Sequence, residues 1–160
     1  MIDGTDARIL TILQQDARTS NAEIARQLGM APSAIFERIR KLEAKGVITG
    51  YAARIAPDAI DLGLLAFIFV RADERLGSRE VGDRIARMPE VQEVHHVAGE
   101  DCYLVKARVA NTEALANLLH DGFGVIPEVR STRTTIVLRT VKETGALPLP
   151  TTAEEELSRA

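Results

Sequence analysis

The spacing of hydrophobic residues changes along the chain, from a helical period in the first third to strand-like runs after residue 64. Near the N-terminus the apolar positions that share one side of a predicted helix are Ile9, Leu10, Ile12 and Leu13. Asp3 or Thr5 can cap the start of this helix, and the pattern stops near Gln15 and Asp16. The chain is therefore predicted to begin with a helix of about three turns.

A second helix is predicted directly afterwards. Ser20 and Glu23 have the spacing of a capping box, in which each side chain accepts a hydrogen bond from a backbone N–H at the helix start. Ile24 and Leu28 lie one turn apart on its apolar side. Gly29 can adopt the left-handed conformation that ends a helix, so this helix is short.

A third helix follows after a tight turn. Pro32 suits its first position, because the N–H that proline lacks would be unpaired there. One apolar stripe is formed by residues at i, i+4 and i+7, namely Ile35, Ile39 and Leu42, and Gly46 closes the helix. Two short helices joined by a glycine turn over residues 20–45 predict a helix-turn-helix that reads DNA.

The side of the third helix opposite the stripe carries polar groups suited to bases and phosphates. The candidate DNA-binding residues there are Ser33, Glu37, Arg40 and Lys41, with Phe36 and Arg38 on the flanks. Ser20 and Asn21 join them, because a helix N-terminus suits a phosphate. The alternative interpretation of this pattern is an ordinary solvated helix face.

The chain then changes character. Residues 47–55 are β-rich around Gly50, which suits either a short hairpin wing or an extended linker strand, and Pro57 marks a boundary. We therefore predict a DNA-binding domain over residues 1–50 and a linker over 51–63. A second domain over 64–142 and a tail over 143–160, disordered or ordered only on contact, complete the chain.

The second domain has the order strand, helix, strand, strand, helix, strand. The predicted strands cover residues 64–72, 91–97, 103–109 and 129–141. The predicted helices are 78–88, ended by Pro89, and one that begins at Asn111 or Thr112 and carries Leu115, Leu118, Leu119 and Phe123. This βαββαβ order predicts an α+β, ferredoxin-like domain, with a four-stranded antiparallel sheet covered by two helices on one face. The uncovered face predicts a homodimer or a larger even-numbered assembly, such as an octamer.

Composition refines this picture. The net charge is −3, but residues 1–56 carry eight Lys and Arg against six Asp and Glu. A surplus of two positive charges is small for DNA binding, so we expect a dimer that presents two copies of this region to the DNA. The chain has one cysteine, Cys102, and neither an apolar run of membrane-spanning length nor the pattern of a signal peptide. These features predict a cytoplasmic protein without an internal disulfide or a membrane partner.

Part of the sequence resembles the Lrp/AsnC, or feast/famine, family of transcriptional regulators. The residues that match in order and spacing are Ile9-Leu10, Arg18, Glu23-Ile24-Ala25, Arg38, Leu42-Glu43 and the run from Gly46 to Tyr51. The resemblance covers roughly residues 2–142, and Ala31 stands where the family usually has Ser. It implies a winged helix-turn-helix that binds double-stranded DNA, and a second domain that forms the dimer and senses small molecules, commonly amino acids.

The same resemblance implies an effector site. The family's turn motif lies on the run from Val97 to Leu104, with Cys102 in place of the usual Asp and an acidic group one residue earlier. The candidate effector-binding residues are Gly99, Glu100, Asp101, Cys102, Tyr103, Thr132 and Thr134. Without the resemblance, residues 98–102 are a plain hairpin turn.

Enzyme, metal and cofactor chemistry have little support. His95 and His96 are adjacent on a predicted strand and point to opposite faces, and His120 is distant in sequence. The sequence contains no Gly-rich phosphate loop, paired-Cys motif or nucleophile elbow, so we expect neither catalysis nor a cofactor. The alternatives are a ligand-sensing or enzyme-regulating ferredoxin-like module with a protein-docking helical domain, and an architectural DNA-binding protein.

Overall fold

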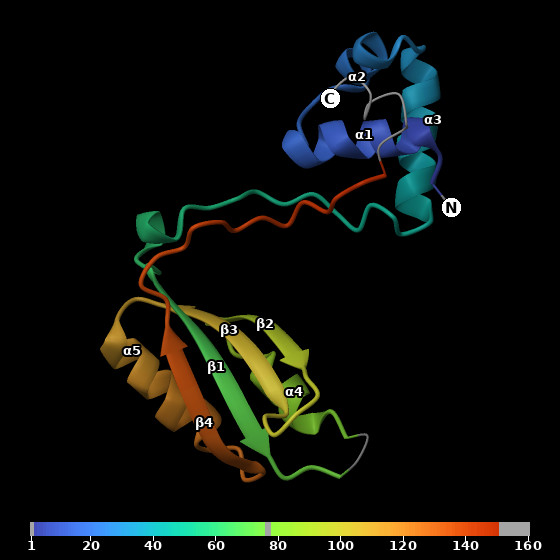
Figure 1. Ribbon diagram of the computed structural model, residues 1–160. Coiled ribbons are helices and arrows are strands. Elements are labelled where there is room, and N and C mark those ends of the chain that lie inside the picture. The colour runs from blue at the N-terminus through green and yellow to red at the C-terminus, as the bar shows by residue number, and fades with distance from the viewer. Residues whose placement is uncertain (1, 76–77, 151–160) are drawn as a thin grey trace, which may run out of the picture. The chain divides into compact units, whose positions relative to one another are not determined.

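The computed structural model describes residues 2–75 and 78–150. They form two compact units (Figure 1). One contains the N-terminal helices up to Ala53 together with the described part of the tail from Glu143, and the other runs from Arg54 to Lys142. The two units are described separately below.

The first unit contains three helices, α1 (Gly4–Gln15), α2 (Asn21–Leu28) and α3 (Pro32–Ala44). Asp3 caps α1, because its carboxylate accepts a hydrogen bond from the Asp6 N–H at 2.8 Å and the Asp6 carboxylate accepts one from the Asp3 N–H at 3.3 Å. The predicted first helix, its cap and its end are thus confirmed.

The cap of α2 is only half of the predicted box. The Ser20 hydroxyl accepts a hydrogen bond from the Glu23 N–H at 3.2 Å, as expected. The Glu23 carboxylate does not return to the backbone but accepts hydrogen bonds from Arg26 and Gln27, one turn further along the helix. A charge-assisted pair with an arginine is the stronger of the two contacts, so the reciprocal half of the box is absent. Gly29 ends the helix at φ +66°, as predicted.

Helix α3 packs its predicted stripe inward. The buried cluster at the centre of this unit consists of Ile9, Ile24, Ala25 and Ile35, with Ile39 packed against it. Ala31 precedes the helix without a side-chain cap, and Pro32 occupies the first turn. Residues 45–56 contain no strand, so the β-rich segment is an extended linker rather than a hairpin wing. The Val47 N–H bonds back to the Leu42 carbonyl instead of to a neighbouring strand.

The second unit begins with a short 3-10 helix, η1 (Pro57–Ile60), and continues as βαββαβ. Its strands are β1 (Leu64–Ala72), β2 (Val91–His96), β3 (Tyr103–Val109) and β4 (Val129–Ile136), in the antiparallel order β2-β3-β1-β4. Its helices are α4 (Glu80–Ile85) and α5 (Thr112–Asn117), the latter continued by a π-helical segment, η2 (Leu118–Phe123). This is the predicted ferredoxin-like arrangement.

Two predicted elements, α4 and β4, were given wrong boundaries. Helix α4 is shorter than residues 78–88, because the Met88 N–H bonds to the Ile85 carbonyl in a tighter turn after the helix. Strand β4 ends five residues before the predicted Val141. Its neighbour β1 begins at Leu64, and the bond from the Val137 N–H to the Leu65 carbonyl is the last one available.

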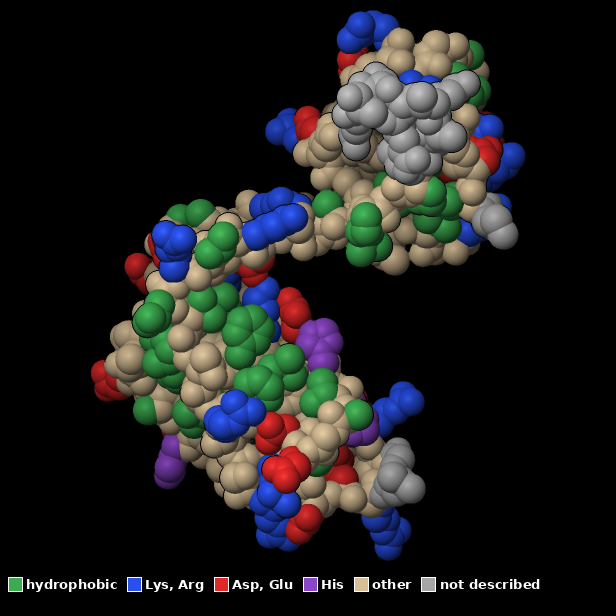
Figure 2. Space-filling view, viewed as in Figure 1, with side chains coloured by type: hydrophobic (Ala, Val, Ile, Leu, Met, Phe, Trp, Pro, Cys, Tyr) green, Lys and Arg blue, Asp and Glu red, His purple; other side chains and the backbone are tan. Residues whose placement is uncertain are grey.

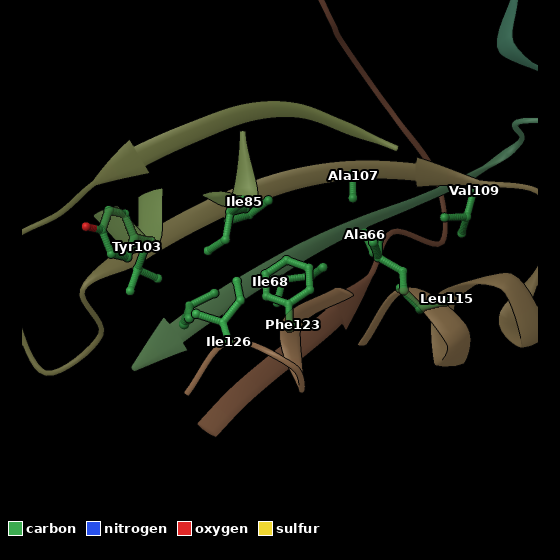
Figure 3. Close-up of a cluster of buried hydrophobic side chains, with 13 residues drawn as sticks. Ala66, Ile68, Ile85, Tyr103, Ala107, Val109, Leu115, Phe123 and Ile126 are labelled. Carbon is green, nitrogen blue, oxygen red and sulfur yellow. The ribbon is translucent and has the colours of Figure 1, made fainter. Parts of the chain in front are cut away.

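One face of the sheet carries the core (Figure 3). Ala66, Ile68 and Val70 of β1 are fully buried with Ile85 of α4 and Phe123 of η2. The intervening residues of β1 point to the opposite face. There Phe67 and Phe69 are only partly buried, and Figure 2 shows hydrophobic side chains over the strands of this unit. Among the described residues no helix packs on this face, because α4, α5 and η2 all contribute to the core on the other side.

Candidate DNA-binding surface and effector site

The outer side of α3 is a continuous exposed surface. The side chains that the structure leaves exposed on it are Ser33, Phe36, Glu37, Arg40 and Lys41. The start of the helix at Pro32 and the burial of the Ile35 and Leu42 side chains determine this orientation. Arg40 lies 3.4 Å from the Glu37 carboxylate, and both side chains remain about half exposed or more. Ser20 and Asn21 lie at the start of α2, where the Ser20 hydroxyl already caps the helix.

Arg38 has different surroundings from its neighbours on α3. Its Nη1 donates hydrogen bonds to the carboxylates of Asp3 and Asp6, each at 2.7 Å. The Asp6 N–H and then Arg38 hold the pKa of Asp3 below its usual value, and the two carboxylates raise the pKa of Arg38. Arg38 therefore ties α3 to the first turn of α1. The sequence offered no signal for this contact, because its partners are more than 30 residues away.

A shallow hollow of about 310 Å³ lies beside the outer side of α3. Asn21, Phe36 and Arg40 line it, together with Tyr51 from the start of the linker. The Tyr51 hydroxyl donates a hydrogen bond to the Glu43 carboxylate at 3.0 Å, so the linker is attached to the end of α3. Sequence analysis did not identify Tyr51 or Glu43 as part of this surface.

The predicted hairpin turn between β2 and β3 is present. The Val97 N–H donates to the Cys102 carbonyl at 2.9 Å, and the Cys102 N–H donates to the Val70 carbonyl at 2.8 Å. Gly99 has φ +137°, a conformation that other residues rarely adopt. Glu100 is exposed next to it. The backbone at Gly99 is thus open to a ligand.

Asp101 and Cys102 point to opposite sides of the sheet. The Asp101 carboxylate accepts a hydrogen bond from Arg133 of β4 at 3.1 Å, and the Arg133 guanidinium lies 4.0 Å from the centre of the Phe69 ring on the uncovered face. The Cys102 thiol instead donates to the Ala72 carbonyl at 3.3 Å and packs against the core. Asp101 is therefore the acidic group of the turn that faces away from the helices.

Thr132 and Thr134 do not join Asp101. In the β1–β4 register they lie opposite Val70 and Ile68, which are buried beneath the helices. Cross-strand partners share a face, so both threonines lie on the helix side of the sheet edge. The structure thus separates the seven candidate effector-binding residues, and a ligand at Asp101 would not contact both threonines of the same chain.

Tyr103 is buried, and its hydroxyl already has a partner. It donates to the Glu74 carboxylate at 2.5 Å, while Ser78 and the Val81 N–H donate to the same carboxylate at 3.0 Å each. Burial and then the bond to Glu74 raise the pKa of Tyr103 to about 12. Burial alone would raise the pKa of Glu74, but these three hydrogen bonds together hold it below its usual value. Tyr103 thus anchors the loop after β1 to β3.

We expect Tyr103→Phe to lower the free energy of unfolding by about 0.5–1.5 kcal/mol near neutral pH. A carboxyl whose pKa is depressed by folding adds stability above its unfolded pKa, and this stability is lost as the pH falls through the folded pKa. The difference in the free energy of unfolding between the variant and the unmodified chain should therefore become smaller in acid, as Glu74 takes up a proton. Urea unfolding between pH 7 and pH 3 measures it, with Tyr51→Phe as the control for an exposed hydroxyl. A difference that stays constant down to pH 3 would contradict the assignment.

The adjacent histidines lie on opposite faces, as predicted. His95 pairs with Glu93 at 3.1 Å, whereas the His96 ring stacks on Tyr103 with centroids 5.0 Å apart. Within residues 2–75 and 78–150, no three His, Cys, Asp or Glu side chains are grouped so that they could hold a metal ion. No helix of the described chain is both long enough and apolar enough to cross a membrane.

The exposed face of α3 and the ferredoxin-like unit together define a helix-turn-helix regulator with a separate ligand-binding domain. Two family models match the chain: winged helix-turn-helix DNA-binding over residues 2–49 and Lrp/AsnC ligand binding domain over residues 65–147. The chain belongs to the Lrp/AsnC family of DNA-binding transcriptional regulators.

Known regulators are similar to this chain over most of its length. The HTH-type transcriptional regulator FL11 of Pyrococcus horikoshii is 43% identical over 92% of this chain and 97% of its own length. The leucine-responsive regulatory protein of Escherichia coli is 35% identical over 94% of this chain and 93% of its own length. The crystal structure of the transcriptional regulator NMB0573 of Neisseria meningitidis, a complex with L-Met, is 31% identical. It superposes with a TM-score of 0.87 over 92% of this chain and 97% of that chain.

Proposed function

We propose that this protein regulates transcription in the cytoplasm as a homodimer or a larger even-numbered assembly that binds specific double-stranded DNA through α3. The observation that carries the proposal is the outer face of α3, where Ser33, Glu37, Arg40 and Lys41 are exposed while the opposite stripe is buried. Exposed Arg and Lys side chains on a helix of this kind suit guanine edges and phosphates in a major groove.

The uncovered sheet face supports the proposed dimer. The partly exposed Phe67 and Phe69 give the uncovered sheet face the apolar character of a surface that pairs. A two-fold dimer presents two α3 helices to a roughly palindromic site and doubles the small positive surplus of residues 1–56.

We further propose that a small amino-acid-like effector binds beside residues 99–101 and changes assembly or DNA affinity. Gly99 allows backbone amides to approach a carboxylate closely, and Asp101 can attract an ammonium group. In the structure Asp101 is paired with Arg133. An α-amino acid can replace this ion pair, with its ammonium group on Asp101 and its carboxylate on Arg133. The similar NMB0573 structure contains L-Met, which supports an effector of this class.

The direct test of the function is to sequence the DNA fragments that the purified protein retains, with and without each of the twenty amino acids. A defined motif with two-fold symmetry is expected. Affinity for that motif should fall steeply with salt as phosphate contacts release counterions. Retention of bulk DNA without a motif would indicate an architectural protein, and the absence of salt-dependent DNA binding would indicate a protein-docking helical domain.

Calorimetry against the twenty amino acids tests the effector site. We expect at least one to bind, and Gly99→Trp to abolish that binding because the indole occupies the open space beside the turn. Gly99→Ala is the matched control, since it imposes the same backbone strain without the bulk. Unchanged binding to Gly99→Trp would place the effector site elsewhere, and no binding by any amino acid would overturn an effector of this class.

A further inference from the structure

The C-terminal segment of the described chain contacts α1 in the first unit, which we call the DNA-binding unit. The Gln14 side chain on α1 donates through Nε2 to the Leu147 carbonyl at 3.1 Å, and its Oε1 accepts from the Leu147 N–H at 2.6 Å. One side-chain amide therefore satisfies both main-chain groups of one residue, as a neighbouring strand would. The two residues are separated by 133 positions in sequence.

The sequence around Leu147 favours this contact. Pro148 and Pro150 restrict the preceding residues, Leu147 and Leu149, to extended conformations, so little backbone freedom is lost when the segment docks. Since proline has no N–H, Leu147 and Leu149 carry the only two backbone N–H groups of residues 147–150. Gln14 accepts a hydrogen bond from the first of them.

The contact depends on the main chain more than on the Leu147 side chain. That side chain is 71% exposed, whereas Leu149 is partly buried. Just before it, the Ala146 N–H donates to the Thr144 hydroxyl at 3.1 Å, which shapes the approach of the chain. An extended segment whose main chain is held by two hydrogen bonds to the Gln14 side chain, and which carries one partly buried leucine, is a docked segment rather than a random tail.

We propose that Gln14 is the docking site for residues 143–150 of the same chain, and that docking gives the DNA-binding unit a second tether. The first tether is the linker that follows α3. The second runs from the end of β4 through residues 137–146 to α1. Two tethers restrict the orientations available to α3, and so reduce the conformational entropy that DNA binding has to remove.

The second tether also starts at a strand that the effector turn contacts. Arg133 on β4 pairs with Asp101 of the turn, four residues before the strand gives way to the tail segment. This part of the inference rests on the proposed function, because it connects an effector at the turn to α1 through the chain from Arg133 to Leu147, with a hydrogen bond to Asp101 at one end and hydrogen bonds to Gln14 at the other. The docking contact itself does not depend on that function.

Amide hydrogen exchange of the full chain, followed by NMR without DNA, tests docking directly. The Leu147 N–H should exchange at least about five-fold more slowly than in a free peptide of residues 143–150. In Gln14→Leu that protection should disappear while α1, α2 and α3 keep theirs. Gln15→Leu is the matched control, because Gln15 is exposed and should leave Leu147 protected. Leu147 exchange at the free-peptide rate in the unmodified chain, or protection that survives Gln14→Leu, would overturn the proposal.

A thermodynamic cycle tests the tether. A chain that ends at Lys142 and the Gln14→Leu variant should each weaken binding to the specific DNA motif by a similar factor of about three to ten, and the combination should be no weaker than the truncation alone. Additive effects would show that Gln14 acts independently of the tail and would overturn the tether. If no DNA motif is found while Leu147 stays protected by Gln14, the proposed function fails and the docking site stands.

Discussion

Arg40→Ala is expected to reduce discrimination between the specific DNA motif and other sequences by about 1–3 kcal/mol while leaving the fold intact. The Arg40 side chain is 67% exposed and only loosely paired with Glu37, so its removal costs the folded protein little. A guanidinium at this position can donate two hydrogen bonds to a guanine edge. Fluorescence anisotropy with the motif and with a scrambled duplex measures the loss.

Two variants on the same helix separate the possible roles of its basic residues. Lys41→Ala should weaken both duplexes alike if Lys41 contacts phosphate. Arg38→Ala should instead destabilise the DNA-binding unit, because it leaves Asp3 and Asp6 without the cation that joins α1 to α3. Unchanged discrimination in Arg40→Ala would remove this residue from the base-reading face.

Phe67→Asp is expected to convert the assembly to monomers. Phe67 lies on the uncovered sheet face, where a dimer would bury it, and an unpaired carboxylate at an apolar interface costs several kcal/mol. In the monomer the new carboxylate stays partly solvated and lies across from Lys106, so the fold should survive. Light scattering gives the mass, and circular dichroism confirms the fold.

The matched control is Val125→Asp, which introduces the same charge at an apolar residue that is 62% exposed in the turn after η2. It should keep the mass of the unmodified protein. An unchanged mass for Phe67→Asp would mean that the uncovered face is not the surface through which copies pair. Specific DNA binding should weaken together with dimer formation, because one α3 provides only half of a two-fold site.

The order of elements could be read from the sequence because its signals are local. Capping at Asp3 and Ser20, the left-handed Gly29 and the stripe of Ile35, Ile39 and Leu42 each depend on residues within two turns of one another. The strands at residues 64–72 and 103–109 were likewise predicted from the composition of each segment, and the βαββαβ order predicted one uncovered face of the sheet. The end of β4 was missed because its partner β1 is distant in sequence, whereas α4 ends in a local tight turn at Met88 that the helical period did not predict.

The sequence by itself determined that the outer face of α3 is polar and that an acidic group follows Gly99 in a turn. Only the tertiary structure decided which of these groups are available. It pairs Arg38 with Asp3 and Asp6, and it buries the Tyr103 hydroxyl against Glu74. It also places Thr132 and Thr134 on the face opposite Asp101 and brings Leu147 to Gln14. The physical reason is that periodicity specifies the face on which a side chain lies, whereas its partner depends on how elements distant in sequence pack together.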